Sequence, residues 1–325
     1  MSVVRRVLLA LASFAFPGLG HALASRPRAF GAWLAAVVIA MLGCTRTVWC
    51  LPLMPAAMLA GALVTFRELG RHEGRLNLPL GIGCVAAWIV ITLAVRLTAL
   101  EAFALPASSM SPTLQIGDHI YADKLTPQLR AMRPGELVVF RQPCSERTFV
   151  KRVVARGGQT VEVRCGALYV DGVAVPTRPA ATCSYPDRVV ESSEARTIAC
   201  SGYVETLGGH TYRTAHQVSR AEHAREPGFA DFPLDSAGPP SCADDPSARP
   251  IGRDEVLGTI VSSTPSADAC APHLHYVVPA GHLFVMGDNR DNSFDSRSWG
   301  AVPERNVIGR VVGIWGPLSR FGDVE

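Results

Sequence analysis

The sequence predicts a mainly β soluble domain with a loop-rich inserted subdomain, preceded by N-terminal transmembrane helices. Apolar residues crowd into positions 7–100, whereas the rest of the 325 residues has the composition of an ordinary soluble domain. That rest contains short β-branched runs separated by Gly, Pro and Asp turns, a pattern typical of strands. A shift to Pro, Ser, Asp and Arg at about 176–265 indicates the insertion. We therefore divide the chain into a membrane region, residues 1–102, and a second domain, residues 103–325.

Apolar stretches make up the membrane region. They lie at residues 7–24, 29–43, 48–66 and 78–97. A helix that spans a bilayer needs about 20 apolar residues. The second stretch is short, and Pro17 and Gly18 interrupt the first, so the third and fourth are the clearest spans. A cleavable signal peptide is not expected, because further hydrophobic segments follow and no small-residue cleavage site precedes a soluble domain.

Arginines flank these stretches and set the expected orientation. They are Arg5, Arg6, Arg26, Arg28, Arg67, Arg71 and Arg75. A hairpin of the second and third stretches places the last five on one side, which the positive-inside rule makes cytoplasmic. The fourth stretch then leads outward, so we expect the second domain on the external face. A full first span would put Arg5 and Arg6 outside, and we therefore expect the first stretch to be re-entrant or interfacial.

The cysteines indicate an oxidising compartment for the second domain. Of nine cysteines, Cys44, Cys50 and Cys84 lie in the apolar region. The other six are Cys144, Cys165, Cys183, Cys200, Cys242 and Cys270. An even set predicts disulfides whose pairing is open, with six reduced thiols as the alternative. No CxxC or Cys/His spacing indicates zinc, so no metal is expected. The net charge of +3, without a basic cluster, argues against a nucleic-acid partner.

Short strands are expected throughout the second domain. The runs are residues 136–141, 149–156, 160–164, 167–170, 275–278, 283–286 and 307–315.

In the second run, strand period places Phe149, Lys151 and Val153 on one face, so the lysine points where apolar side chains point. Burial lowers a lysine pKa and turns the amine into a base, which an arginine does not become. Lys151 is one of two lysines among 31 Lys plus Arg, which favours chemistry over a snorkelling surface lysine.

Four local sequences stand out after the last apolar stretch. They are LPASSMSPTL at residues 105–114, RPGELVVF at 133–140, TFVKRVV at 148–154 and GDNRDNSFDSRSWG at 287–300. In this order they resemble the boxes of type I signal peptidases. Taken singly, the first is a polar turn, the next two are β-signals and the last is an Asx-rich turn without EF-hand spacing. The resemblance covers residues 103 to about 315 and implies a catalytic domain of coiled antiparallel sheets.

The resemblance implies a serine protease that works without histidine, metal or cofactor. Ser109 matches the nucleophile, and Lys151 matches the general base. Ser293 matches the serine that hydrogen-bonds and orients the lysine, while Asp295 and Arg297 match the pair that steadies its loop. The candidates for the substrate pocket are Met110, Leu114, Phe149 and Val150.

The implied reaction is removal of signal peptides from exported preproteins by an acyl-enzyme mechanism. The implied partners are preproteins with small residues at the first and third positions before the cut, and the lipid bilayer. The implied location is the bacterial cytoplasmic membrane, with several spans and a periplasmic catalytic domain. One alternative is a specialised relative that matures conjugative-pilus proteins, and another is a catalytically weak protein that only binds exported chains. Soluble self-cleaving repressors also use Ser and Lys, but the apolar stretches argue against them.

One position departs from the family pattern. The residue two before the nucleophile is commonly Ser or Thr, whose hydroxyl helps the Ser109 backbone N–H to stabilise the oxyanion, whereas this chain has Ala107. An oxyanion donor contributes a few kcal/mol to lowering the barrier. We expect either a slower enzyme or a replacement donor, with Ser108 and a water as the two candidates.

Overall fold

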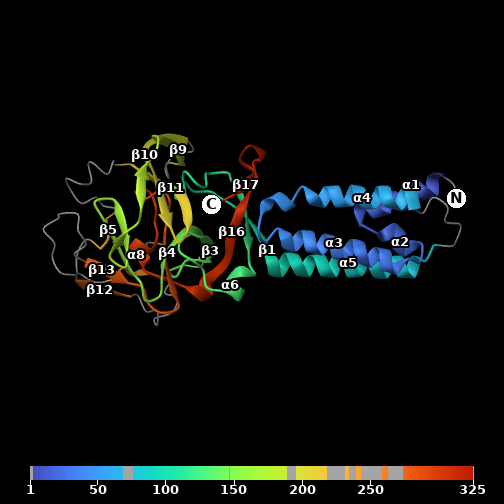
Figure 1. The fold of residues 1–325 in the computed structure, drawn as a ribbon, viewed down its shortest axis with the longest axis horizontal. Helices are drawn as coiled ribbons and strands as arrows, with labels where there is room; N and C mark the ends of the chain where they lie inside the picture. Colours follow the sequence, from blue (N-terminus) through green and yellow to red (C-terminus); the bar gives the residue numbers. More distant parts are fainter. Residues whose placement is uncertain are drawn as a thin grey trace.

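The molecule consists of two parts arranged end to end, a bundle of helices that includes the N-terminus and a β-rich domain (Figure 1). The computed structural model describes residues 3–68, 76–145, 147–188, 195–217, 231–233, 239–242, 258–262 and 274–324. Arg71, Arg75 and Cys270, which the sequence interpretation used, lie outside the described residues.

Apolar helices form the bundle. They are α1 (Val3–Ala15), α2 (Leu19–Leu23), α3 (Pro27–Gly43), α4 (Leu53–Glu68) and α5 (Leu78–Ala99). Two segments, Val48–Glu68 and Leu78–Ala99, are long and apolar enough to cross a membrane. They coincide with the third and fourth apolar stretches of the sequence, which were the clearest candidate spans.

The first apolar stretch folds into two helices because the chain turns at Gly18, whose φ is 84° in the left-handed region. Polar contacts hold this turn against α4. Thr65 Oγ1 lies 2.7 Å from Ser13 Oγ, which also accepts the Gly20 N–H at 2.8 Å. With 13 residues, α1 is about 20 Å long, which is shorter than the hydrocarbon core of a bilayer. The short length of α1 fits a first stretch that is re-entrant or interfacial, which stays a prediction.

An antiparallel sheet of eight strands forms the centre of the β domain. In spatial order it contains β1 (Leu100–Ala104), β2 (His119–Asp123), β16 (Val307–Gly316), β3 (Leu137–Arg141), β4 (Thr148–Arg156), β14 (His282–Met286) and β15 (Val302–Pro303), and β17 (Gly322–Asp323) pairs with β16. The pairings of β16 with β2 and β3, and of β14 with β4, contain register shifts. Such bulges bend and twist a sheet, so the sheet is curled and the predicted coiled antiparallel fold is confirmed.

Two smaller antiparallel sheets complete the domain. One has the order β12 (Thr259–Ser262), β13 (Leu274–Val277), β5 (Thr160–Arg164), β6 (Ala167–Val170) and β7 (Val173–Ala174). The other has the order β11 (His210–His216), β10 (Ala195–Leu207) and β8 (Thr177–Pro179), with β9 (Cys183–Arg188) paired to β10. Strands β8 to β12 fall within the predicted insertion, where a few strands were expected. The domain boundaries themselves stay a prediction.

Short helical turns lie between several of these strands and between α3 and α4. They are η1 (Val48–Cys50), α6 (Thr126–Leu129), α8 (Ser296–Trp299), η4 (Glu304–Asn306) and η5 (Leu318–Arg320).

Strand β4 lies at the centre of the core, because it contributes to three separate apolar clusters. Val154, Val150 and Val153 each belong to a different one. Both faces of the strand are therefore covered. Lys151 and Arg152, which lie between these valines, are only 2% and 0% exposed. Two cationic side chains thus sit inside the domain, where each needs polar partners.

Disulfide bonds are present in both parts of the molecule. They join Cys144 to Cys242, Cys183 to Cys200 and Cys44 to Cys50, and Cys165 is also disulfide-bonded. The prediction of disulfides in the second domain is confirmed. The Cys44–Cys50 bond was not expected, because both residues lie in the apolar region that the sequence interpretation left unpaired.

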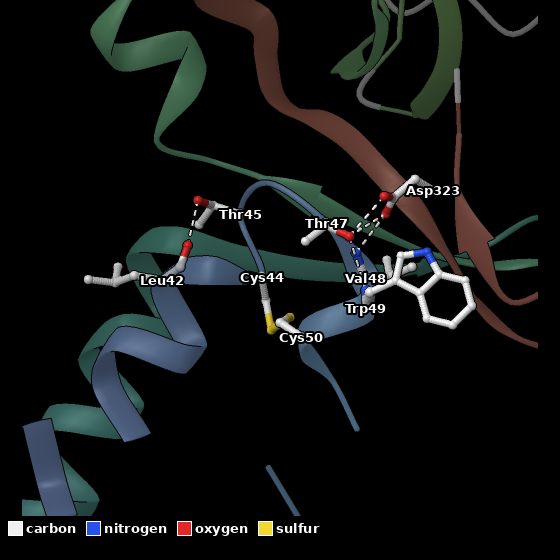
Figure 2. Close-up of a disulfide and its surroundings, with 8 residues drawn as sticks. All are labelled: Leu42, Cys44, Thr45, Thr47, Val48, Trp49, Cys50 and Asp323. Atoms are coloured by element: carbon white, nitrogen blue, oxygen red, sulfur yellow. Dashed lines mark hydrogen bonds between the residues drawn. A yellow bond between two sulfur atoms is a disulfide. The ribbon is translucent and has the colours of Figure 1, made fainter. Parts of the chain in front are cut away.

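The Cys44–Cys50 bond closes the 44–50 loop, which connects α3 to α4 at the end of the bundle nearest the β domain (Figures 1 and 2). The Thr47 hydroxyl donates to the Asp323 carboxylate at 2.8 Å, and the Val48 N–H donates to the same carboxylate at 2.8 Å. Arg310 Nη2 donates to the Thr45 carbonyl at 2.9 Å. The β domain is therefore joined to the bundle twice, through the direct continuation of α5 into β1 and through this loop.

Candidate active site

Ser109 and Lys151 meet although they are 42 positions apart, with Lys151 Nζ 2.6 Å from Ser109 Oγ. Ser109 belongs to the connection between β1 and β2, residues 105–118, which we call the Ser109 loop. The base of this loop is closed, since the Leu105 N–H donates to the Asp118 carbonyl and the Gly117 N–H donates to the Leu105 carbonyl, both at 2.9 Å. A closed loop and a central strand thus hold the two side chains in contact.

Burial lowers the pKa of Lys151 to about 8. Loss of water around the ammonium is the main cause, and the positive charge of Arg297 acts in the same direction. The carboxylates of Asp295 and Asp288 oppose the shift. The amine also lies 5.5 Å from the centroid of the Phe149 ring. Near pH 8 about half of the amine is neutral and able to accept a proton from a hydroxyl.

The loop of residues 287–300, which we call the Asx loop, packs directly against the Ser109 loop. The Asn289 N–H donates to the Ser109 carbonyl at 3.1 Å. A Cβ on Gly287 would lie 2.2 Å from Ser293 Oγ and 2.5 Å from the Ser109 carbonyl oxygen, so only glycine fits. Ser293 therefore lies at the site. Its hydroxyl makes no hydrogen bond to Lys151 in the part of the chain that the structure describes, and its lysine-orienting role stays a prediction.

Asp295 and Arg297 form a buried ion pair within the Asx loop. The Asp295 carboxylate accepts from Arg297 Nε at 2.9 Å, from Arg297 Nη2 at 2.8 Å and from the Gly287 N–H at 3.0 Å. Burial alone would raise the pKa of Asp295, but the charge and hydrogen bonds of Arg297 outweigh it and lower that pKa. Arg297 Nη2 also donates to the Arg290 carbonyl at 2.7 Å. This geometry is consistent with the loop-supporting role expected of the pair.

A second buried ion pair joins the Asx loop to β4. Arg152 donates to both carboxylate oxygens of Asp288, at 2.8 Å from Nε and 2.6 Å from Nη2, and both side chains are fully buried. The guanidinium also stacks on the Tyr212 ring, 3.8 Å from its centroid. The strand that carries Lys151 is thus fixed to the loop that faces Ser109. The sequence interpretation did not select either residue, although Arg152 adjoins Lys151 and Asp288 belongs to the last box.

The insertion also contacts the Asx loop. Arg290 donates to both carboxylate oxygens of Glu205 in β10, at 3.0 and 2.6 Å. In β11, the Ala215 N–H donates to the Asp288 carbonyl at 2.8 Å and the Ala215 carbonyl accepts the Arg290 N–H at 2.9 Å. Strands from the compositionally distinct region therefore help to shape the site.

The Ser108 hydroxyl, a candidate replacement donor for the oxyanion, is engaged elsewhere. It donates its single hydrogen to Asp187 Oδ1 at 2.7 Å. Asn292 Nδ2 donates to Ser108 Oγ at 3.2 Å and to Asp187 Oδ2 at 3.0 Å. The Ser109 N–H, by contrast, has no acceptor among the described residues. One backbone donor therefore remains open beside Ser109 Oγ.

Three of the four candidate pocket residues lie together. Met110, Leu114 and Val150 share one buried cluster. Phe149 lies on the other face of β4, where its ring packs edge-on against Trp299 with centroids 5.3 Å apart. A role of these side chains in substrate binding stays a prediction. Within the described ranges, no group of three or more His, Cys, Asp or Glu side chains is placed to hold a metal ion.

Comparisons with known proteins identify the family of this chain. A family model described as "Signal peptidase, peptidase S26" matches residues 82–316. A signal peptidase I of Aquifex aeolicus is 30% identical over 234 residues, covering 70% of this chain and 80% of that protein. A signal peptidase I of Pseudomonas aeruginosa is 27% identical over 251 residues, covering 70% and 68%. A probable thylakoidal processing peptidase 2 of Arabidopsis thaliana is 25% identical over 245 residues, covering 73% and 43%.

Among solved structures, a signal peptidase I from Enterococcus faecalis is 20% identical and covers 56% of this chain and 96% of its own, with a TM-score of 0.24 that is too low to support an inference. The family match, in contrast, spans both loops of the site and more than half of the chain. The chain therefore belongs to the signal peptidase family, peptidase S26.

Proposed function

We propose that this chain removes signal peptides from exported preproteins, with Ser109 as the nucleophile and Lys151 as the general base. The observation that carries the proposal is the 2.6 Å contact between Ser109 Oγ and the buried Lys151 Nζ. An amine with a pKa of about 8 is neutral often enough near physiological pH to act as a base. The names of the matched relatives support the substrate class.

In the acylation step, neutral Lys151 accepts the Ser109 hydroxyl proton while Oγ attacks the carbonyl carbon of the scissile peptide. The tetrahedral intermediate collapses, the C–N bond breaks, and Lys151 gives its proton to the leaving amine. In deacylation, Lys151 accepts a proton from water as the water oxygen attacks the ester carbon. That proton passes to Ser109 Oγ as the ester C–O bond breaks, so the cycle ends with Lys151 neutral and Ser109 protonated.

The Ser109 N–H is the donor that we assign to the developing oxyanion. It adjoins the attacking oxygen and has no acceptor among the residues described above. Position 107, where relatives commonly supply a hydroxyl, is an alanine. Because a donor aimed at the developing charge acts mainly in the transition state, the rate of acylation depends strongly on how well this one N–H is held.

We further propose that α4 and α5 span the bacterial cytoplasmic membrane and that the β domain lies in the periplasm. The Cys44–Cys50 disulfide lies at the end of the bundle next to the β domain, and disulfides persist in oxidising compartments. Arg26, Arg28 and Arg67 lie at the opposite helix ends, as expected of a cytoplasmic side. The lipid bilayer is then a partner, and substrates carry small residues at the first and third positions before the cut.

Full-length protein purified in detergent should cleave a preprotein after an Ala-x-Ala sequence, with the cut located by mass spectrometry of the products. Ser109→Ala and Lys151→Arg should abolish cleavage. Lys124→Arg is the matched control, because Lys124 is the other lysine and forms a surface ion pair with Glu101 at 3.1 Å. Turnover that persists in Ser109→Ala would refute the proposal, and binding without turnover by the unmodified protein would favour a binding role instead.

A further inference from the structure

We infer that Asp187 is a positioning residue that holds the Ser109 loop so that the Ser109 N–H faces the oxyanion. The inference rests on the proposed function and deepens it. It starts from two observations made above: Ala107 supplies no hydroxyl, and the Ser108 hydroxyl is bonded to a carboxylate from the insertion.

Asp187 forms a small network with one residue from each loop of the site. Its Oδ1 accepts the Ser108 hydroxyl at 2.7 Å, and its Oδ2 accepts Asn292 Nδ2 at 3.0 Å. Asn292 Nδ2 lies 3.2 Å from Ser108 Oγ and closes the triangle. Hydrogen bonds to a carboxylate are roughly twice as strong as those between neutral groups, so this is a firm attachment for the residue that precedes the nucleophile.

The attachment determines the direction of the Ser109 N–H through the peptide unit that joins Ser108 to Ser109. In a trans peptide the C=O and the following N–H point in opposite directions. The Ser108 carbonyl accepts Asn289 Nδ2 at 3.2 Å and the Ser111 N–H at 2.9 Å. Because hydrogen bonds hold both the carbonyl and the side chain of Ser108, the peptide plane has little freedom to rotate. The N–H is therefore oriented before substrate arrives.

Asp187 is itself carried on a well-anchored strand. In β9 the Cys183–Cys200 disulfide ties the start of the strand to β10. Tyr185, two residues before Asp187, is 1% exposed, and its hydroxyl accepts Gln217 Nε2 at 2.9 Å. The carboxylate is thus presented from a fixed backbone. A positioning group on a rigid element can hold the reacting atoms within the narrow tolerance that catalysis needs.

The test compares single-turnover and steady-state cleavage of the same preprotein by full-length variants. Asp187→Ala and Ser108→Ala should each lower kcat roughly tenfold or more with little change in KM, since they loosen a transition-state donor. The double variant should be no slower than the slower single variant, because both changes break the same hydrogen bond, the one between Ser108 and Asp187. Asp187→Asn keeps an acceptor for the Ser108 hydroxyl and should recover most of the rate. Ser184→Ala, an exposed position on the same strand, is the matched control and should leave the rate unchanged.

Two further measurements distinguish a positioning role of Asp187 from a general loss of structure. The pH at which the rate rises should stay the same in Asp187→Ala, because the change acts on the oxyanion donor and not on Lys151. The melting temperature of Asp187→Ala should remain close to that of the wild-type protein, so that a lower kcat reflects the position of the Ser109 loop and not unfolding. If Asp187→Ala cleaves at the wild-type rate, or if the losses of rate add up in the double variant, this inference alone is overturned. No cleavage by the wild-type protein would overturn the proposed function and this inference with it.

Discussion

Raising the pH from 6 to 8 should increase the acylation rate of the wild-type protein about 50-fold. With a pKa of about 8, Lys151 is about 1% neutral at pH 6, about 9% neutral at pH 7 and half neutral at pH 8. With its ordinary value of 10.5, about one amine in 3,000 would be neutral at pH 7, so burial increases the competent fraction about 300-fold. The rate should therefore level off above pH 8 and not above pH 10.

Single-turnover cleavage of a preprotein, followed from pH 6 to 10.5, measures this profile without interference from product release. In the same assay Lys151→Arg should lose about 10²- to 10⁴-fold in rate, because the guanidinium keeps its proton throughout this range. A rising limb centred near pH 10 would contradict the argument from burial. A near-normal rate in Lys151→Arg would refute the assignment of the base.

Four further results are expected. Because burial holds the folded-state pKa of Lys151 below its unfolded-state value, the ammonium destabilises the fold below about pH 8, and unfolding measured against Lys151→Met should show this destabilisation being relieved from about pH 8 to 10.5. Ala107→Ser should raise the single-turnover acylation rate about tenfold, since the Ser108 hydroxyl is committed to Asp187, and a flat or lower rate would point to a donor already in place. Asp288→Ala should lower the free energy of unfolding by about 3 to 5 kcal/mol in denaturant titrations, because it removes the buried carboxylate that balances the charge of Arg152, whereas Glu101→Ala in a surface pair should cost less than about 1 kcal/mol. Protease added to intact spheroplasts should digest residues 103–325, and protection of that region would contradict the proposed topology.

Local signals were enough to predict much of the β domain. The runs at 160–164 and 167–170 coincide with β5 and β6, because alternating β-branched residues bounded by turn residues specify a strand without reference to the rest of the chain. Strand β1 was not predicted. Its residues, Leu100–Ala104, continue the apolar composition of α5, and they become a strand through pairing with β2, which is visible only in three dimensions.

The site was predictable to the extent that its residues stand in recognisable boxes. Lys151 could be selected because a lysine is rare in this chain and lies on an apolar strand face. Asp187 could not, because its partner Ser108 is 79 positions away and the surrounding composition resembles a surface loop. The contact between Glu205 and Arg290, which are 85 positions apart, could not be predicted either. Contacts of such separation leave no periodic trace in a single sequence.

The double connection between the bundle and the β domain has a geometric consequence. A domain attached only where α5 becomes β1 would swivel about that junction. The bonds from the 44–50 loop to Asp323, and from Arg310 to Thr45, remove this rotation. In a bilayer, Ser109 and Lys151 would then stay at one height and one tilt above the lipid. The enzyme would then select the cleavage point by its distance from the membrane. A preprotein whose cleavage point lies a few residues too near to its membrane-embedded segment, or too far from it, would be cut slowly, whatever side chains surround the scissile bond.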